Sequence, residues 1–361
     1  MPPALEMLLA SLGETGTLVV VRNDRSVTLT GGEPGLSVVT VPEEGDNPDS
    51  ILSSADAFVE LNSALAPVPV ILRVASGAVI VRPVLVVHWI DSDAAYFPKT
   101  VVQVGTNAEV TIGEVLASDD RDALVVPVTE LDVADGARLR YAHLQRLGPR
   151  VWQIGRQVSR VGRDGTLTSM AVALGGSYAR LRTDSALVGS GGSSQLQAVY
   201  FAAGEQMHDF RTLQDHRAPK TTSNLLYKGA VANRARSVYS GLIRVAKGAR
   251  GTVAYQTNRN LVLHEGAHAE SVPNLEIEDN DVRCSHASAV GPIAEDQRFY
   301  LESRGVPTET ADRLIALGFV DEVLAGLPLP NAVAALRLEL AAKLDAADRA
   351  ESLVAAGGVP R

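Results

Sequence analysis

A thiol and an imidazole lie two residues apart near the end of the chain, at Cys284 and His286. If this segment is a strand, both side chains project from the same face, because side chains alternate along a strand with a period of two. Sulfur and imidazole nitrogen both bind soft and borderline metal ions. The pair is therefore a candidate metal-binding pair, although a lone cysteine is also often a small buried apolar residue.

Three further residues that could exchange protons are Asp209, Asp215 and His216. Carboxyl and imidazole groups are the usual acids and bases of enzymes, so this set could serve a lyase or hydrolase that cleaves polysaccharides. The chain shows no cleft of aromatic residues suited to stack on sugars. We therefore favour a polar turn at this place.

The segment His264-Glu265-Gly266-Ala267-His268 has the residue types of a metalloprotease zinc motif. That motif requires a helix, which places both histidines on one face. Here the segment follows the strand-like run Asn260 to Leu263, contains Gly266 and is soon followed by Pro273. We predict two histidines at a turn of a β-scaffold.

The glycine-rich segments do not match a nucleotide-binding loop. Lys99-Thr100 and Lys220-Thr221 each follow a proline and lack the glycines of a P-loop. In Gly189-Ser190-Gly191-Gly192 the third glycine of the dinucleotide fingerprint is missing, because Ser194 stands in its place. We expect no ATP site and no NAD site in this chain.

Charge and composition limit the partners. The chain has 33 Lys and Arg against 42 Asp and Glu, a net charge of −9, which opposes binding to nucleic acid and to anionic lipid. Its apolar runs are far shorter than the roughly 20 residues that span a bilayer, and its N-terminus lacks the basic region of a signal peptide. We expect a cytoplasmic protein that binds neither nucleic acid nor membrane.

The chain has 1 cysteine, which excludes an internal disulfide and a four-thiolate metal site. Any metal centre of this type would need ligands from a second chain.

Residues 76–290 contain many short β-branched runs separated by Gly, Asn and Asp, with few stretches of helical period. Tight turns between such runs recur at Gly105-Thr106-Asn107, Asp135-Gly136 and Lys247-Gly248. This loose recurrence indicates a mainly β solenoid whose rungs bury one continuous core. A β-sandwich or barrel remains an alternative on composition alone.

The two ends of the chain differ from this core. Residues 1–75 combine a short helix, strand-like runs, a turn at Glu43 to Pro48 and a helical pattern at Ile51 to Leu65, which indicates a small α/β cap. Residues 291–361 are helical. The predicted helices are Glu295 to Ser303, Thr308 to Leu324 and Asn331 to Leu344. Because the terminal rungs of a solenoid expose strand edges, we expect these end regions to cap it.

Several segments, in one order along the chain, resemble the SufB/SufD family of iron–sulfur cluster assembly proteins. They are Asp209-Phe210-Arg211-Thr212 with His216, Thr222-Ser223-Asn224-Leu225-Leu226-Tyr227-Lys228-Gly229, Gln256-Thr257-Asn258-Arg259-Asn260-Leu261-Val262-Leu263, Pro273-Asn274-Leu275-Glu276-Ile277, Asp281-Val282-Arg283-Cys284-Ser285-His286 and Gln297-Arg298-Phe299-Tyr300-Leu301-Glu302-Ser303-Arg304-Gly305. A weaker likeness includes Phe58-Val59-Glu60-Leu61-Asn62. The resemblance implies a right-handed parallel β-helix flanked by helical or mixed end domains.

Within this family, Cys284-Ser285-His286 is similar to the SufD branch, because SufB chains carry His-Glu where this chain has His286-Ala287. The resemblance implies a non-enzymatic scaffold subunit that pairs with a SufB paralogue and with a SufC ATPase. It places Cys284 and His286 at the SufB–SufD interface, where a transient iron–sulfur cluster forms. We expect His286, ahead of Cys284, to be the ligand or proton carrier.

The resemblance also implies that the C-terminal helical region binds SufC. The candidate docking residues are Phe299, Tyr300, Arg304, Leu314 and Phe319. Two alternatives stay open at this point. One is a homodimeric SufB-like scaffold, and the other is a β-helix lyase or hydrolase that acts on polysaccharides.

Overall fold

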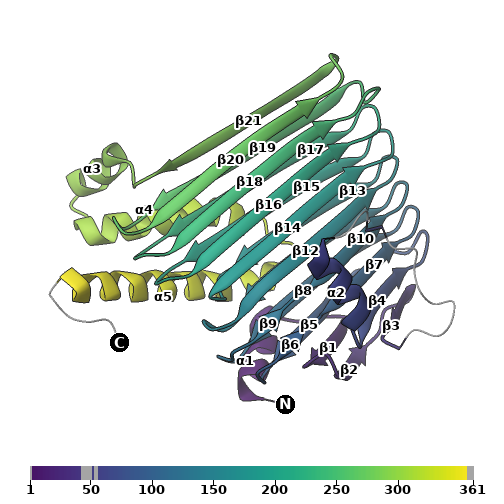
Figure 1. The fold of residues 1–361 in the computed structure, drawn as a ribbon, viewed down its shortest axis with the longest axis horizontal. Coiled ribbons are helices and arrows are strands. Elements are labelled where there is room, and N and C mark those ends of the chain that lie inside the picture. Colours follow the sequence, from purple (N-terminus) through teal and green to yellow (C-terminus); the bar gives the residue numbers. More distant parts are fainter. Residues whose placement is uncertain (1, 42–50, 53–55, 356–361) are drawn as a thin grey trace.

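The structure is a computed structural model that describes residues 2–41, 51–52 and 56–355. The chain alternates between two long sheets, sheet A and sheet B, which stack from the N-terminal to the C-terminal end (Figure 1). In order across sheet A, the strands are β2 (Ser26–Gly31), β1 (Thr17–Arg22), β5 (Val84–Ile90), β8 (Glu109–Ser118), β11 (Arg138–Arg146), β13 (Thr166–Ala173), β15 (Ser193–Ala202), β17 (Thr222–Val231), β19 (Thr252–Val262) and β21 (Val282–Gly291). In order across sheet B, they are β20 (His268–Ile277), β18 (Arg236–Val245), β16 (Met207–His216), β14 (Tyr178–Leu187), β12 (Trp152–Val161), β10 (Val128–Val133), β7 (Lys99–Val104), β4 (Pro69–Val74) and β3 (Leu36–Val39), with the short β6 (Ala95–Tyr96) and β9 (Leu124–Val125) beside this path.

Successive coils stack by parallel, in-register pairing. Strand β17, for example, pairs with β15 on one side and β19 on the other. Every residue of β5 is buried, because one of its faces lies against the solenoid interior and the other against helices. The prediction of a mainly β, parallel β-helix core is confirmed.

The tight corners predicted from the turn residues are present. Asn107, Gly136 and Gly248 have φ values of 55°, 67° and 91°. Glycine and asparagine tolerate this left-handed backbone region better than other residues, which explains their recurrence between strands. One predicted strand, Leu124 to Val128, is instead divided into β9 and β10, because Pro127 lies between them and has no N–H to donate to a ladder.

Helices cover the outer face of sheet A. They are α1 (Pro3–Leu12), α4 (Thr308–Leu324) and α5 (Pro330–Ala355), while α3 (Glu295–Ser303) lies against α4. Helices α3 and α4 have the predicted bounds, whereas α5 extends beyond the predicted Asn331 to Leu344. The shared core includes Leu8, Val87, Leu144, Val199, Val320 and Leu336. Lys343 of α5 also donates hydrogen bonds of 2.7 Å to Phe201 O and of 2.7 Å to Gln206 Oε1, which fixes the helix beside the solenoid.

Helix α2 (Ala57–Leu65) lies over sheet B (Figure 1). It begins later than the predicted Ile51, because Asp56 Oδ1 accepts hydrogen bonds of 3.1 Å from the backbone N–H groups of Phe58 and Val59 and so caps the helix. Ile51 and Leu52 are not helical, and the intervening positions 53–55 lie outside the described residues.

Strands β1 and β4 lie within residues 1–75 and pair in parallel with β5 and β7, so this region continues both sheets. The turn predicted at Glu43 to Pro48 lies outside the described residues. Among the helices that the structure describes, none has both the length and the apolar character needed to cross a membrane.

Candidate functional site

Within the described residues, no strand or helix covers the C-terminal end of the solenoid, which is therefore called the open end below. Strands β20 and β21 are the last strands of their sheets, and each pairs with a neighbour on one side only, β18 and β19 respectively. Figure 1 shows β21 along the upper rim of the stack. The expectation that the C-terminal helices cap this end is wrong, because α4 and α5 use their apolar faces against the outer face of sheet A.

Each of these two strands is 10 residues long and presents a free edge of backbone N–H and C=O groups. Such an edge is a template for pairing with another chain. Apolar side chains accompany the edge, since Leu275, Ile277 and Val290 are 38%, 42% and 43% exposed. Exposed apolar residues beside two edges that have no partner strand in the described structure make this end a candidate interaction surface.

Cys284 and His286 both lie on β21, as the sequence predicts, and one residue separates them. Cys284 is partly buried and packs against the apolar cluster that includes Ile243 and Val245, whereas His286 is exposed. The register pairs Cys284 with Ala254 and His286 with Gln256 on β19. The two candidate residues therefore stand together on the terminal rung, at the open end.

Burial raises the pKa of the Cys284 thiol above its ordinary value, although the backbone of Ala254 opposes this shift. The thiol is therefore protonated at neutral pH and must lose its proton before it binds iron. A neighbouring base or a bound metal ion would favour that loss. His286 lies two residues further along the strand, with its side chain on the same face.

The two residues do not complete a metal site by themselves. Throughout the described ranges, no group of three or more His, Cys, Asp and Glu side chains is arranged to hold a metal ion. A cluster that used one thiolate and one imidazole would need further ligands. Since the pair lies at an open end, a second chain could supply them.

Gln256 is a residue of this site that the sequence analysis does not single out. Its side chain is 1% exposed, and neither its amide nitrogen nor its amide oxygen has a hydrogen-bond partner in the described structure. The signal in the sequence is its period-two spacing with Asn258 and Asn260, which places all three on one face of β19.

The alternative acid/base set is not assembled. Asp209, Asp215 and His216 lie along strand β16 rather than in a turn, so the predicted turn is wrong. His216 is on the inner face, where its ring contacts Thr221 Oγ1 at 2.7 Å. Both aspartates are on the opposite face, because each lies an odd number of positions before His216 on the strand, and they pair with arginines. These three residues cannot act on one substrate.

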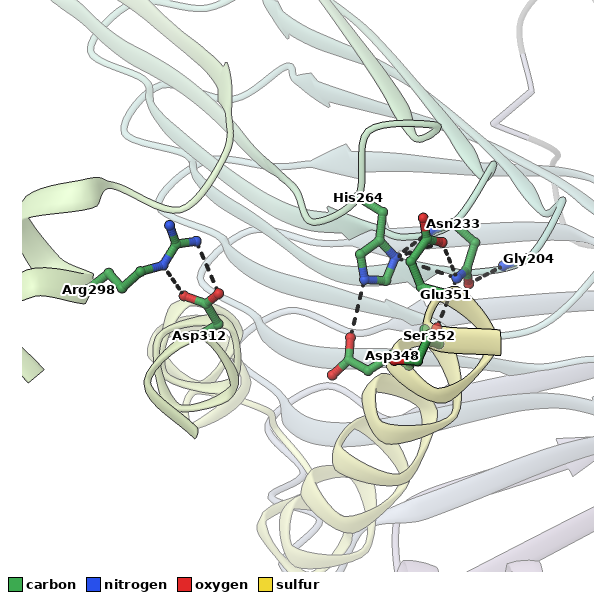
Figure 2. A network of polar contacts seen from close by, with 9 residues as sticks. Gly204, Asn233, His264, Arg298, Asp312, Asp348, Glu351 and Ser352 are labelled. Carbon is green, nitrogen blue, oxygen red and sulfur yellow. Dashed lines mark hydrogen bonds and ion pairs between the residues drawn. The ribbon is translucent and has the colours of Figure 1, made fainter. Parts of the chain in front are cut away.

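His264 lies in the turn between β19 and β20, as predicted, whereas His268 is the first residue of β20. Figure 2 shows His264 against helix α5, with Nε2 3.3 Å from Asp348 and Nδ1 3.6 Å from Glu351. His264 Nδ1 also accepts the backbone N–H of Asn233 at 2.9 Å. This histidine therefore fastens α5 to the solenoid, beside a groove of about 690 Å³ that helices α3, α4 and α5 line.

The five candidate docking residues differ in accessibility. Phe299 and Tyr300 on α3 are 70% and 59% exposed, and Leu314 on α4 is 49% exposed. Arg304, which follows α3, lies 5.4 Å from the centre of the Tyr300 ring. Phe319 points inward instead, with Lys228 Nζ 4.5 Å above its ring.

Comparison with known proteins identifies the family of the chain. Residues 88–319 match the family model described as "SUF system FeS cluster assembly, SufBD core domain". The chain is 38% identical over 210 residues to an iron–sulfur cluster assembly SufBD family protein of Mycobacterium tuberculosis, covering 56% of this chain and 53% of that protein. It thus spans about half the length of that relative.

Two further relatives cover more of the chain. The iron–sulfur cluster assembly protein SufD of Escherichia coli is 30% identical over 287 residues, which cover 78% of this chain and 67% of that protein. The chloroplastic protein ABCI7 of Arabidopsis thaliana is 28% identical over 288 residues, covering 76% and 60%. With a solenoid matched over most of its length, the chain belongs to the SufBD family of the SUF iron–sulfur cluster assembly system.

Proposed function

We propose that this chain is a non-catalytic scaffold subunit that pairs through its open end with a SufB paralogue. The observation that carries the proposal is the terminal rung, where two unpaired edges of 10 residues each lie beside Cys284 and His286. A partner strand laid on β21 would satisfy the free backbone groups and cover the exposed apolar side chains.

The cargo of the paired complex is a nascent iron–sulfur cluster. In this proposal His286 supplies an imidazole ligand or carries a proton, and Cys284 supplies a thiolate. The partner supplies the remaining ligands, because two side chains cannot hold a cluster. The cluster is a transient substrate shared between the two chains.

The exposed residues of α3 and α4 form the proposed contact with a SufC ATPase. They are Phe299, Tyr300, Arg304 and Leu314, and α3 follows β21 directly along the chain. ATP binding and hydrolysis in SufC would shift the helices between two arrangements for which SufC has different affinities. The close link between α3 and β21 would carry that shift to the open end.

The test of pairing is co-expression with the cognate SufB and SufC paralogues, followed by size-exclusion chromatography with light scattering. We expect a complex of all three proteins. Leu275→Lys with Val290→Lys should release the SufB paralogue, since both substitutions place charges on the apolar rim, whereas the control Val188→Lys should not. A monomer indifferent to both partners would overturn the proposal, and a stable homodimer would favour the homodimeric scaffold.

The test of the site is the rate of cluster assembly in the purified complex. His286→Ala should lower this rate about tenfold or more, the usual scale for lost metal-site groups. Ser285→Ala is the matched control, because Ser285 lies between the two candidate residues but on the opposite face of β21. Equal rates for His286→Ala and the wild type would contradict the role of His286.

The test of SufC docking is a double variant, Phe299→Ser with Tyr300→Ser. Both side chains are more than half exposed, so the variant should fold normally but bind SufC more weakly. Leu338→Ser on α5 is the control, since Leu338 is 74% exposed and outside the proposed contact. Unchanged SufC binding by the double variant would reject α3 as the contact.

A further inference from the structure

Gln256 carries a buried amide whose hydrogen bonds are not made. The side chain is 1% exposed, and both Nε2 and Oε1 lack partners within the part of the chain that the structure describes. The neighbouring amides on the same face are satisfied, since Asn258 donates to Tyr200 at 3.1 Å and Asn260 donates to Asn258 at 2.8 Å. A buried unsatisfied amide is destabilising, so its presence here calls for a reason.

The place of this amide is defined by two neighbours. Across the interior lies Gly241 on β18, where an added Cβ would stand 2.5 Å from Gln256 Nε2, so the amide occupies space that a side chain at Gly241 would fill. Toward the open end, the residue paired with Gln256 on β21 is His286. Strands in register lie about 4.8 Å apart and project matching residues to the same side, so the two side chains are direct neighbours.

We propose that Gln256 is a positioning residue for His286: its amide oxygen, which has no partner in the described structure, turns to accept the N–H of one ring nitrogen and leaves the other nitrogen free. A histidine that binds metal commonly donates its second ring N–H to an oxygen acceptor, which fixes the tautomer and the ring orientation. Gln256 Oε1 is a buried acceptor in the adjacent position. The role in cluster assembly rests on the function proposed above, whereas the proposed hydrogen bond between the two side chains does not.

The experiment is ¹⁵N NMR of the full chain labelled at histidine, recorded at pH 8, with His286→Ala used to assign the His286 signals. Gln256→Met keeps the length of the side chain and removes the amide. It should change the ratio of the two His286 tautomers by a factor of about two to ten, the effect of one net hydrogen bond. Gln256→Glu keeps an oxygen acceptor and should preserve the ratio.

Stability measurements separate positioning from a packing role. Because the amide of Gln256 has no other hydrogen-bond partner in the described structure, Gln256→Met should lower the urea midpoint by no more than the loss of the one proposed hydrogen bond to His286. Gln195→Met, at an exposed residue of β15, is the matched control and should leave the His286 tautomers unchanged. A tautomer ratio in folded Gln256→Met equal to that of the wild type would overturn the inference.

The tautomer experiment and the cluster-assembly experiment can fail independently of each other. If His286→Ala complexes assemble clusters at the wild-type rate, the cluster role fails, whatever the tautomers show. If the tautomers do not respond to Gln256→Met while His286→Ala blocks assembly, the site stands and Gln256 is not its positioning residue.

Discussion

Lys228 on β17 and Glu322 on α4 join the solenoid to the C-terminal helices, with Nζ 2.6 Å from Oε2. The two side chains are in unequal surroundings, since the lysine is 2% exposed and the glutamate 62% exposed. A buried ammonium depends on its partner far more than a solvated carboxylate does.

The first prediction follows from this asymmetry. Glu322→Gln should lower the free energy of unfolding by about 1–3 kcal/mol, because it leaves a buried charge with a weaker partner. Lys228→Met should lower it less, since the remaining glutamate is solvated. Urea titration measures both. The control Glu205→Gln removes one partner of an exposed ion pair with Arg234 and should have little effect.

The second prediction concerns two glycines with opposite surroundings. A Cβ at Gly229 would overlap the ring of Tyr200, which is fully buried, whereas at Gly318 on α4 nothing lies within 4 Å. Gly229→Ala should therefore cost about 1–3 kcal/mol by overpacking, and Gly318→Ala should add about 0.5–1 kcal/mol by helix propensity. Thermal or urea unfolding of both variants would show opposite shifts, and equal shifts would contradict the packing argument.

The third prediction concerns Asn62 on α2. This residue is buried, and its Nδ2 donates to Pro98 O at 2.8 Å and to Val126 O at 2.8 Å. Asn62→Ala should lower the free energy of unfolding by about 1–3 kcal/mol, because two carbonyl groups lose their donor. Faster hydrogen exchange should appear in α2 before other elements. Leu61→Ala, at an exposed neighbour on the same helix, should change neither measurement appreciably.

The fourth prediction is a loss of stability in acid. Burial lowers the pKa of His208 to about 3, an effect that the charge of Lys343 reinforces. Burial also lowers the pKa of His216 to about 4. Both rings are neutral in the folded chain but take up a proton below their ordinary pKa of 6.5 when it unfolds. Stability is therefore present above pH 6.5 and falls as the pH drops from 6.5 toward 4, by at most about 1.4 kcal/mol per pH unit for each histidine.

Urea midpoints measured between pH 7 and pH 4.5 test this slope. His216→Gln should reduce the slope of the urea midpoint against pH by the contribution of one histidine, even if the variant is less stable at every pH. His268→Gln, at an exposed histidine, should leave the slope as it is. If the urea midpoint of the wild type stays constant as the pH drops from 6.5 to 4.5, these histidines are not held neutral in the folded chain.

Local signals made much of the fold predictable. Asn and Gly at corners identify the turns, while Pro307 before α4 and Gly326 with Pro328 after it mark the bounds of that helix. The register in which the coils stack is harder to predict from the sequence, because the number of residues per coil varies. Trp152 pairs with Tyr178 and Arg236 with His268, and the second separation is longer than the first. A repeat of variable length does not reveal its register to a search for periodicity.

The site was predictable only in part, for a related reason. Cys284 and His286 are two residues apart, so their shared face follows from the strand alone. Gln256 is brought beside His286 by the pairing of β19 with β21, and its missing hydrogen bonds are a property of the packed interior. The placement of the C-terminal helices on sheet A, rather than over the open end, likewise depends on tertiary packing.

The two ends of the solenoid are not equivalent in the described structure. The N-terminal end finishes in β2 and β3, antiparallel edge strands of 6 and 4 residues, whereas the C-terminal end carries two parallel edges of 10 residues each. Two chains joined at their C-terminal ends use up these long edges and leave none of the same kind. A pair formed in this way, as proposed above, offers no further long edge on which a filament could grow.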